Sequence, residues 1–517
     1  MLFNSYVFIF GFMPVTLIGF YSLARVDREW AKTFLMLASF AFYGWWDVRY
    51  VPLLAASVLF NYFVGKRIQY CVGVSQTRAV KIWRNCGVLA NLALLGYFKY
   101  TNFLVDNLNV AFDTAFTLHH IVLPLGISFF SFQKIAYLID SARGQIKQSG
   151  LLGFSLFAAF FPQLISGPIV RYDEVYPQFE SRRFIPAAKR NIMVGLVIFA
   201  IGLAKKTVIA DTAGGIATPL FDAASHGETL GFTVGWIAAA TYTVQLYFDF
   251  SGYSDMAIGL ARMFGIALPL NFHSPLRASG IIDYWRRWHM TLQRLMVSYL
   301  YQPLSLAITR KAVNSDMGRW SVFGLSVAAP AFISFVVIGI WHGAGWTFVL
   351  FGVMHAIYVC TNEAWREDLK QRRRRLKRSA QDDGLASRIF YHTLTIICVM
   401  LANVMFRADH VATAGVIYQG MFGFADAVGA AGTVDTVKVL FFLLGASAII
   451  AIMPNTQQIM RCYVPAVNWR QWRNVAPSLV AYRWRPNAFG ILAAGAALFL
   501  GLAFIERGET AFLYFNF

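Results

Sequence analysis

The stretch VFGLSVAAPAFISFVVIGIW at residues 322–341 contains twenty residues and no charged side chain. A helix needs about 20 predominantly apolar residues to cross the hydrocarbon core of a bilayer, so this stretch predicts a membrane span. Comparable runs recur outward from it in both directions, at residues 6–24, 121–139, 231–250 and 487–504. The pattern therefore predicts a polytopic membrane protein.

The composition supports this fold class and excludes others. Of the 517 residues, 57% are hydrophobic and 14% charged, whereas an ordinary soluble domain has about 25% charged residues. A β-barrel is excluded because its strands alternate apolar and polar residues, while these runs are continuously apolar. We therefore expect an all-α polytopic integral membrane protein, with further spans at residues 33–46, 50–64, 85–98, 191–210, 345–361, 389–405 and 439–453.

The net charge of +19 is unevenly distributed. Residues 65–84, 171–190, 270–320, 366–378 and 455–486 hold 30 of the 45 basic side chains, whereas residues 101–120, 211–230 and 408–437 hold none. Loops rich in Lys and Arg face the cytoplasm, so the first set is predicted to be cytoplasmic. The opening residues are predicted to form a first span that is retained and not cleaved, with the N-terminus extracytoplasmic. Membrane orientation and contact with anionic lipids explain the charge, and we expect no nucleic-acid partner.

Residues 151–170 are apolar enough to cross, yet both flanks are basic. Their interior carries Pro162, Gly167 and Pro168, which break helices. Because irregular backbone at membrane depth requires surrounding protein or a water-filled cavity, we predict a re-entrant segment beside a wet interior. The five cysteines show no metal-ligand spacing, so neither a metal site nor a structural disulfide is expected.

Two histidines occur in distinctive surroundings. His342 lies in GIWHGAGW at the end of a strongly apolar run; an ionisable group there is costly and favours function over a structural role. Imidazole is also suited to accept a proton near neutral pH. His289 ends DYWRRWH, where a helix would place Asp283 four residues before Arg287, and Trp285 four before His289. The alternative interpretation of that segment is an interfacial amphipathic helix anchored by tryptophans.

Other polar residues are weaker candidates. Asp249 and Asp255 lie in QLYFDFSGYSD, and each could instead pair with Arg262 or cap a turn at a helix end. His355 also lies in an apolar run, but its spacing of 13 residues from His342 does not require the two to share a helix face.

In chain order, YFDFSGYSDMAIGLARMFG, NFHSP, DYWRRWHMTL and GIWHGAGWTFVLFGVMHA resemble the membrane-bound O-acyltransferases (MBOAT), specifically the bacterial branch that includes the alginate O-acetylation membrane protein. The likeness divides the chain into N-terminal membrane helices at 1–110, an MBOAT catalytic core at 111–410 and C-terminal membrane helices at 411–517. It implies a multi-helix core thinned around a central channel.

The resemblance also implies acyl transfer from a cytoplasmic thioester donor, acyl-CoA (acetyl-CoA) or another thioester, to an acceptor on the outer face, with no bound cofactor. His342 matches the family's catalytic histidine and His289 its second functional histidine. The other candidate substrate-binding residues are Trp285, Arg286, Arg287, Trp288, Trp341, Asp249, Asp255 and His355.

The expected partner is an extracytoplasmic acetyltransferase that modifies a polysaccharide such as alginate, and the expected location is the bacterial inner membrane. Two alternatives remain open at this point: a lipid O-acyltransferase with a long-chain donor, and a transporter of a lipid-linked sugar. Many transporters are built from internal repeats. The two halves of this chain show no such repeat.

Overall fold

A computed structural model describes residues 1–117, 121–146, 150–181, 187–312, 317–375, 384–424, 435–505 and 513. The described residues form helices and no β-strand. Most of the closing sequence FLYFNF and residues 376–378 of the basic segment 366–378 lie outside the described residues.

The N-terminal half contains eleven α-helices within these ranges: α1 (Met13–Val26), α2 (Arg28–Gly44), α3 (Val51–Gly73), α4 (Thr77–Phe112), α5 (Ile127–Ala142), α6 (Leu151–Ala159), α7 (Phe161–Leu164), α8 (Tyr172–Phe179), α9 (Ala188–Ala204), α10 (Asp211–Ser225) and α11 (Phe232–Met263). A π-helical turn, η1 (Val7–Phe12), precedes α1 and another, η3 (Lys205–Ala210), joins α9 to α10 without a break.

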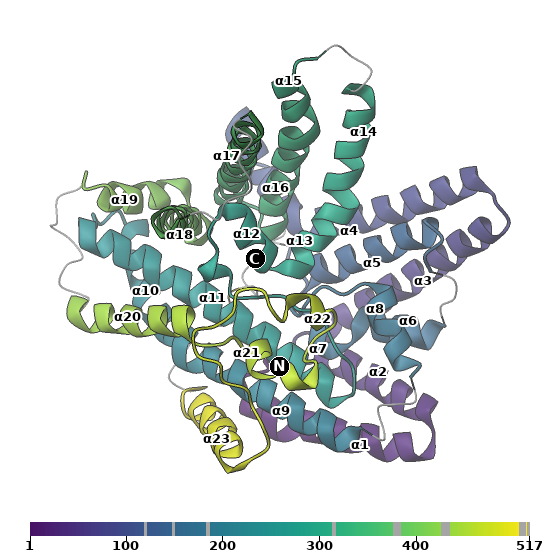
Figure 1. Cartoon of the computed structure of the whole chain (residues 1–517). Helices are drawn as coiled ribbons and strands as arrows, with labels where there is room; N and C mark the ends of the chain where they lie inside the picture. Colours follow the sequence, from purple (N-terminus) through teal and green to yellow (C-terminus); the bar gives the residue numbers. More distant parts are fainter. Residues whose placement is uncertain are drawn as a thin grey trace.

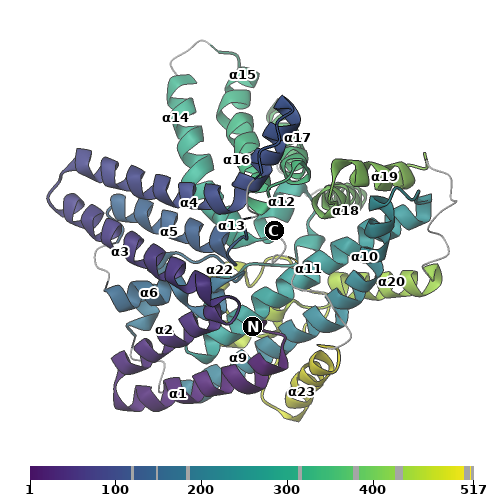
Figure 2. The same ribbon diagram turned by 180° about the vertical axis from the view of Figure 1, so that it is seen from behind.

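The rest of the described chain contains α12 (Ile281–Arg287), α13 (Met290–Met296), α14 (Gln302–Ala312), α15 (Arg319–Phe323), α16 (Ala329–His342), α17 (Trp346–Arg375), α18 (Leu385–Arg407), α19 (Val411–Met421), α20 (Thr436–Ile452), α21 (Thr456–Ile459), α22 (Trp469–Trp472) and α23 (Ala488–Ala503). Figures 1 and 2 show the long outer helices spreading from a centre where α11, α12 and α13 lie.

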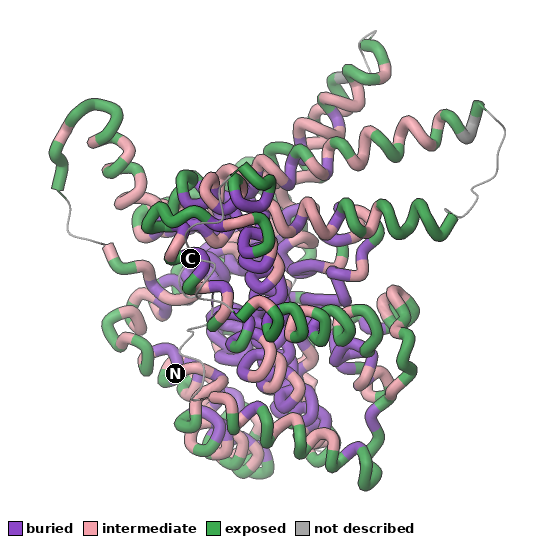
Figure 3. Tube along the Cα trace, turned by 90° about the vertical axis from the view of Figure 1, so that its left-hand side faces the viewer, coloured by how far each residue is buried: buried purple, intermediate pink, exposed green. Residues whose placement is uncertain are grey.

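The protein is a multi-pass membrane protein. Within the described ranges six helical segments are long and apolar enough to cross a bilayer: Val7–Val26, Val48–Gly73, Thr77–Phe112, Ala188–Ser225, Arg319–His342 and Leu385–Arg407. Buried residues gather in the middle of the molecule and exposed ones along the outer helices (Figure 3). This distribution suits a protein whose outer helices face lipid while its centre is surrounded by protein.

Helices continue beyond two of the predicted spans for the same physical reason. Helix α11, which contains the predicted span 231–250, continues to Met263 and is not among the six segments above, and the helix that contains 191–210 continues through η3 and α10 to Ser225. Lys206 Nζ lies 2.7 Å from Asp249 and 2.6 Å from Asp211, so charges that resemble loop residues neutralise one another inside the protein. Buried ions are tolerated when they are paired in this way.

The packing of α9 against α11 brings these charges together. A Cβ added to Gly195 would lie 2.5 Å from the carbonyl oxygen of Gly259, and one added to Gly252 would lie 2.8 Å from that of Gly202. Small residues at both crossings therefore allow the two backbones to touch.

The segment predicted to re-enter is broken in the structure. Helix α6 has nine residues, about 14 Å of helix, which is under half of a bilayer core. At the breaks, Phe161 N donates to Ser39 Oγ over 3.2 Å and Ile169 N donates to Thr291 Oγ1 over 3.0 Å. Hydroxyl groups of neighbouring elements thus accept hydrogen bonds from backbone N–H groups that have no helical partner at the breaks.

Candidate active site

His342 is the last residue of α16, as the sequence predicts for the end of an apolar span. The chain then becomes extended at Gly343, where a Cβ would lie 2.1 Å from the ring of Phe348 at the start of α17. A side chain larger than hydrogen has no room there. The imidazole of His342 is 3% exposed, with the rings of Trp341 and Phe406 centred 5.0 and 5.1 Å away.

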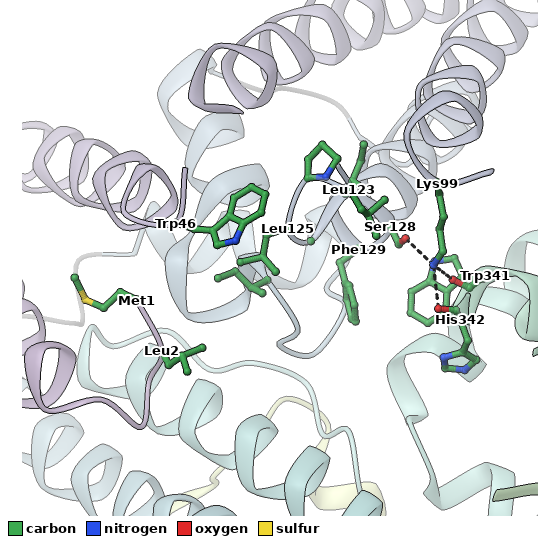
Figure 4. A pocket seen from close by; sticks show the side chains of 14 residues that line it. Met1, Leu2, Trp46, Lys99, Leu123, Leu125, Ser128, Phe129, Trp341 and His342 are labelled. Carbon is green, nitrogen blue, oxygen red and sulfur yellow. Dashed lines mark hydrogen bonds between the residues drawn. The ribbon is translucent and has the colours of Figure 1, made fainter. Parts of the chain in front are cut away.

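Lys99 holds the end of α16 in place from α4. Its ammonium group donates to the carbonyl oxygens of Trp341 and of His342, the latter over 3.1 Å, and to Ser128 Oγ over 3.4 Å (Figure 4). The last carbonyls of a helix lack intrahelical partners and carry negative potential, so a cation suits them. Sequence reasoning missed Lys99, although a lone lysine within a long helical run was a possible signal.

A cavity of about 230 Å³ reaches His342 from one side. Lys99, Trp341 and His342 lie together at one part of its wall, while Met1, Leu2 and Trp46 lie across it (Figure 4). The remaining wall comes mainly from residues 123–129 and Ile165. Ile165 belongs to the broken segment 151–170, which the sequence predicted to lie beside a wet interior.

A second, much smaller cavity borders His342 from the direction of α12. It holds about 10 Å³, roughly the space for one water molecule. Its lining includes Trp285, Trp288, His355 and Phe406. His342 therefore separates two cavities that share no other lining residue.

The segment 283–289 is not one helix, and this prediction was wrong. Helix α12 ends at Arg287, Trp288 is extended, and His289 takes a left-handed conformation with φ 42°. Trp285 and His289 therefore do not share a helix face. A left-handed non-glycine residue costs about 1–2 kcal/mol, and such strain is typical of functional sites.

The interfacial-helix alternative is also wrong, because His289 is fully buried. Its Nδ1 lies 3.1 Å from Asn271 Oδ1, and its ring is centred 4.8 Å from that of Phe250. The indole of Trp341 is centred 6.0 Å from His289 and 5.0 Å from His342. The structure thus gathers the two histidines around one tryptophan, although 53 positions separate them in the sequence.

The other residues of the DYWRRWH motif have varied surroundings. Trp285 Nε1 donates to His355 Nδ1 over 3.1 Å, which brings His355 into the site. Trp288 is buried against Phe272, with ring centroids 5.0 Å apart. The helical spacing of Asp283 and Arg287 is confirmed, and the two form an ion pair at 2.7 Å, whereas Arg286 is exposed. Neither arginine lines the two cavities beside His342.

Asp249 and Asp255 were expected near a helix end. Both instead lie within α11. Asp255 accepts from Lys205 over 2.7 Å and from Thr456 and Gln457 over 2.6 Å. The expected pairing with Arg262 was therefore wrong, because lysines of η3 reach both carboxylates first. Neither aspartate lines a cavity beside His342, and their contacts indicate a structural role.

Within the described ranges, no group of three or more His, Cys, Asp or Glu side chains is arranged to hold a metal ion. The chemistry available at His342 is that of an imidazole at the meeting point of two cavities, beside a buried lysine and an indole. Such a group is suited to accept a proton and return it.

The sequence matches the model of the membrane-bound O-acyltransferase family over residues 116–401, more than half of the chain. It is 39% identical over 459 residues to the peptidoglycan O-acetyltransferase of Helicobacter pylori, covering 82% of this chain and 80% of the relative. It is 36% identical over 429 residues to the probable alginate O-acetylase AlgI of Pseudomonas aeruginosa, covering 82% and 75%. A teichoic acid D-alanyltransferase of Streptococcus thermophilus is 29% identical over 249 residues, 47% of this chain and 57% of the relative.

Two of the motifs that resemble the family supply the histidines of this site. His342 lies at the end of α16, and His289 lies between α12 and α13. The chain belongs to the membrane-bound O-acyltransferase family and is a membrane-embedded O-acyltransferase.

Proposed function

We propose that this enzyme transfers an acetyl group from a cytoplasmic thioester donor, such as acetyl-CoA, to a hydroxyl group on the outer side of the bacterial inner membrane. The acceptor pathway ends in O-acetylation of an extracytoplasmic polysaccharide. The names of its relatives support this acceptor class, since they act on peptidoglycan and alginate. Alginate and peptidoglycan are the two polysaccharides to test first.

The observation that carries the proposal is the position of His342 between two cavities. The larger one is lined by Met1 and Trp46, which the distribution of basic residues predicts to be extracytoplasmic. The smaller one is lined by residues of α12, within the basic segment 270–320 that is predicted to be cytoplasmic, and by Asn403 and Phe406 near the end of α18. It holds about one water, so a donor arriving from the α12 side would have to widen it before meeting the acceptor at His342.

In the proposed reaction His342 acts as general base. It takes the proton of the acceptor hydroxyl while that oxygen attacks the carbonyl carbon of the thioester; the new C–O bond forms, the C–S bond breaks, and the thiolate leaves with the proton returned. General base catalysis of this kind contributes about 10²- to 10⁴-fold. Holding the two substrates in line supplies much of the rest.

The geometry distinguishes between two candidate donors to the oxyanion. Trp346 Nε1 donates to Asn107 Oδ1 over 2.9 Å and is already engaged. Trp341 Nε1 has no hydrogen-bond partner among the described residues, and Trp341 lines the larger cavity. We therefore assign the Trp341 indole N–H, and not that of Trp346, to the developing negative charge.

His289 is assigned to donor positioning. It contacts the same indole as His342 and is held by Asn271 on the α12 side of the site. Trp285 and His355, which hydrogen-bond to each other, line the smaller cavity on the same side of His342. In this scheme the acetyl group passes to a separate extracytoplasmic acetyltransferase that modifies the polymer.

The test uses purified full-length protein and acetyl-CoA labelled in the acetyl group, with thiol release and acetyl transfer measured together. His342→Ala should lower turnover by at least about 10², or about 2.7 kcal/mol of barrier, because the base is lost. His226→Ala, an exposed histidine at the end of α10, is the matched control. Wild-type turnover in folded His342→Ala would refute the role of this histidine.

The same assay separates the two alternatives. Preference for long-chain donors over acetyl-CoA would indicate a lipid O-acyltransferase. Movement of a lipid-linked sugar without thioester cleavage would indicate a transporter.

A further inference from the structure

A third cavity, of about 180 Å³, lies where the start of α9 meets the end of α11. It shares no lining residue with either cavity beside His342. Arg190 and Asn191 enter it from the first turn of α9, and Arg262 from the last turn of α11. No carboxylate is among its lining residues.

The two arginines of this cavity form no ion pair with a carboxylate of the described residues. Arg262 Nη2 reaches the carbonyl oxygen of Tyr463 over 3.4 Å, and its Nε has no partner among the described residues. Arg190 makes no ion pair or side-chain hydrogen bond with the described part of the chain, and its charge acts unfavourably on that of Arg262. Two like charges that share a cavity are stabilised when an anion enters between them.

The acidic residues that precede Arg190 in the sequence are engaged elsewhere. Glu180 lies 3.0 Å from both Arg28 and Lys32. Glu174 forms a two-pronged ion pair with Arg294. The positive charge of the cavity is therefore left for a ligand to neutralise.

Arg262 supplies a second observation. Its Nε is buried and has no partner among the described residues, and a buried polar group without a partner is costly. Asn191 and Gln178 also line the cavity, and Gln178 is held by two hydrogen bonds to Ala267 of 2.8 and 2.9 Å.

We propose that this cavity binds a phosphate group. Guanidinium groups form paired, charge-assisted hydrogen bonds with phosphate oxygens, and a phosphate offers further acceptors to the amide of Asn191. The cavity exceeds the roughly 30 Å³ that one water occupies in the liquid several times over, which leaves room for a substituted phosphate. Its position in the predicted cytoplasmic segment 171–190 puts it within reach of headgroups and soluble phosphates.

Two sources of this phosphate are compatible with the site: an anionic phospholipid, and the phosphates of coenzyme A. Only the second rests on the proposed function. Arg262 follows Phe250, which contacts His289, by 12 residues, or about 18 Å along α11. A coenzyme held here would have to extend its thioester arm over that length to reach the histidines.

The test measures binding and not turnover, so its failure is distinct from failure of acetyl transfer. Full-length protein carrying Arg262→Gln, Arg190→Gln or Asn191→Asp is compared with wild type. Retention of phosphatidylglycerol is followed by native mass spectrometry, and coenzyme A is titrated by calorimetry. Arg78→Gln, an exposed arginine at the start of α4, controls for general attraction of anions.

Each of the three variants should weaken one of the two ligands by about tenfold or more, because a charge-assisted contact is lost or repelled, while Arg78→Gln binds as wild type. Loss of lipid alone identifies a headgroup; loss of coenzyme A alone identifies the donor. Unchanged binding of both ligands in monodisperse variants overturns the proposal. Because Arg190 is exposed, Arg190→Gln keeps the test valid even if Arg262→Gln does not fold.

Discussion

Replacing Lys99 by Met should separate the positioning of His342 from its chemistry. Methionine keeps much of the length of the side chain but has no charge and no hydrogen-bond donor. The carbonyl oxygens of Trp341 and His342 would then lose their shared partner at the end of α16. We expect acetyl transfer to fall sharply while the fold persists.

The magnitude follows from these contacts. Each hydrogen bond from a charged donor contributes about 1.5–3 kcal/mol, and each buried carbonyl left unsatisfied costs about 1–3 kcal/mol. Burying the ammonium group costs several kcal/mol that methionine does not incur. The opposing effects leave a loss of about 2 kcal/mol in the free energy of unfolding, within the usual range for a single substitution.

The substitution should affect the rate of acetyl transfer more than the stability of the fold. A displacement of a catalytic group by about 1 Å lowers the rate by about 10², which corresponds to about 2.7 kcal/mol of activation free energy. We therefore expect kcat to fall by about 10² in Lys99→Met while KM for the donor changes little. Lys99→Arg, which keeps the charge, should recover part of kcat.

The assay is acetyl transfer by purified protein, with thermal unfolding measured on the same samples. Lys66→Met, on the exposed side of α3, is the matched control. Equal kcat in Lys99→Met and wild type would refute the positioning role. A fall in kcat that Lys99→Arg and Lys99→Met share to the same extent would show that charge at this position is irrelevant.

Four further predictions follow from the fold and the site. His289→Ala should raise the donor KM more than it lowers kcat, in steady-state kinetics, because it positions the donor; a pure kcat effect would contradict that assignment. Asp255→Asn should lower the free energy of unfolding by up to about 3–5 kcal/mol because it leaves Lys205, whose side chain is only 15% exposed, without its charged partner, whereas an unchanged melting temperature would exclude a structural role. Gly252→Val should also lower it, since its Cβ would lie 2.8 Å from the carbonyl oxygen of the facing glycine. Cysteine probes at Ser75 and Asp113, at the two ends of α4, should be labelled from opposite sides in intact cells, with only the second reached from outside.

Some features of the site could be predicted from sequence motifs and others could not. The sequence placed His342 at the end of a span and next to glycines, and the structure has both features. The helical spacing of Asp283 and Arg287 was also recoverable, because an i, i+4 pair depends only on local geometry. The same spacing failed for Trp285 and His289, since α12 ends at Arg287 and His289 turns back into the core.

Hydrophobicity is a local property that adds along the chain, so the sequence by itself determined the all-helical membrane class and the approximate place of the six segments that can cross a bilayer. Which charges lie inside the protein depends on partners that are distant in sequence. Lys99 meets Trp341 and His342 across 242 and 243 positions, and Asp255 meets Gln457 across 202. Only the tertiary structure decided that these groups neutralise one another in the core, that α11 continues through them, and that His342 and His289 face a common tryptophan.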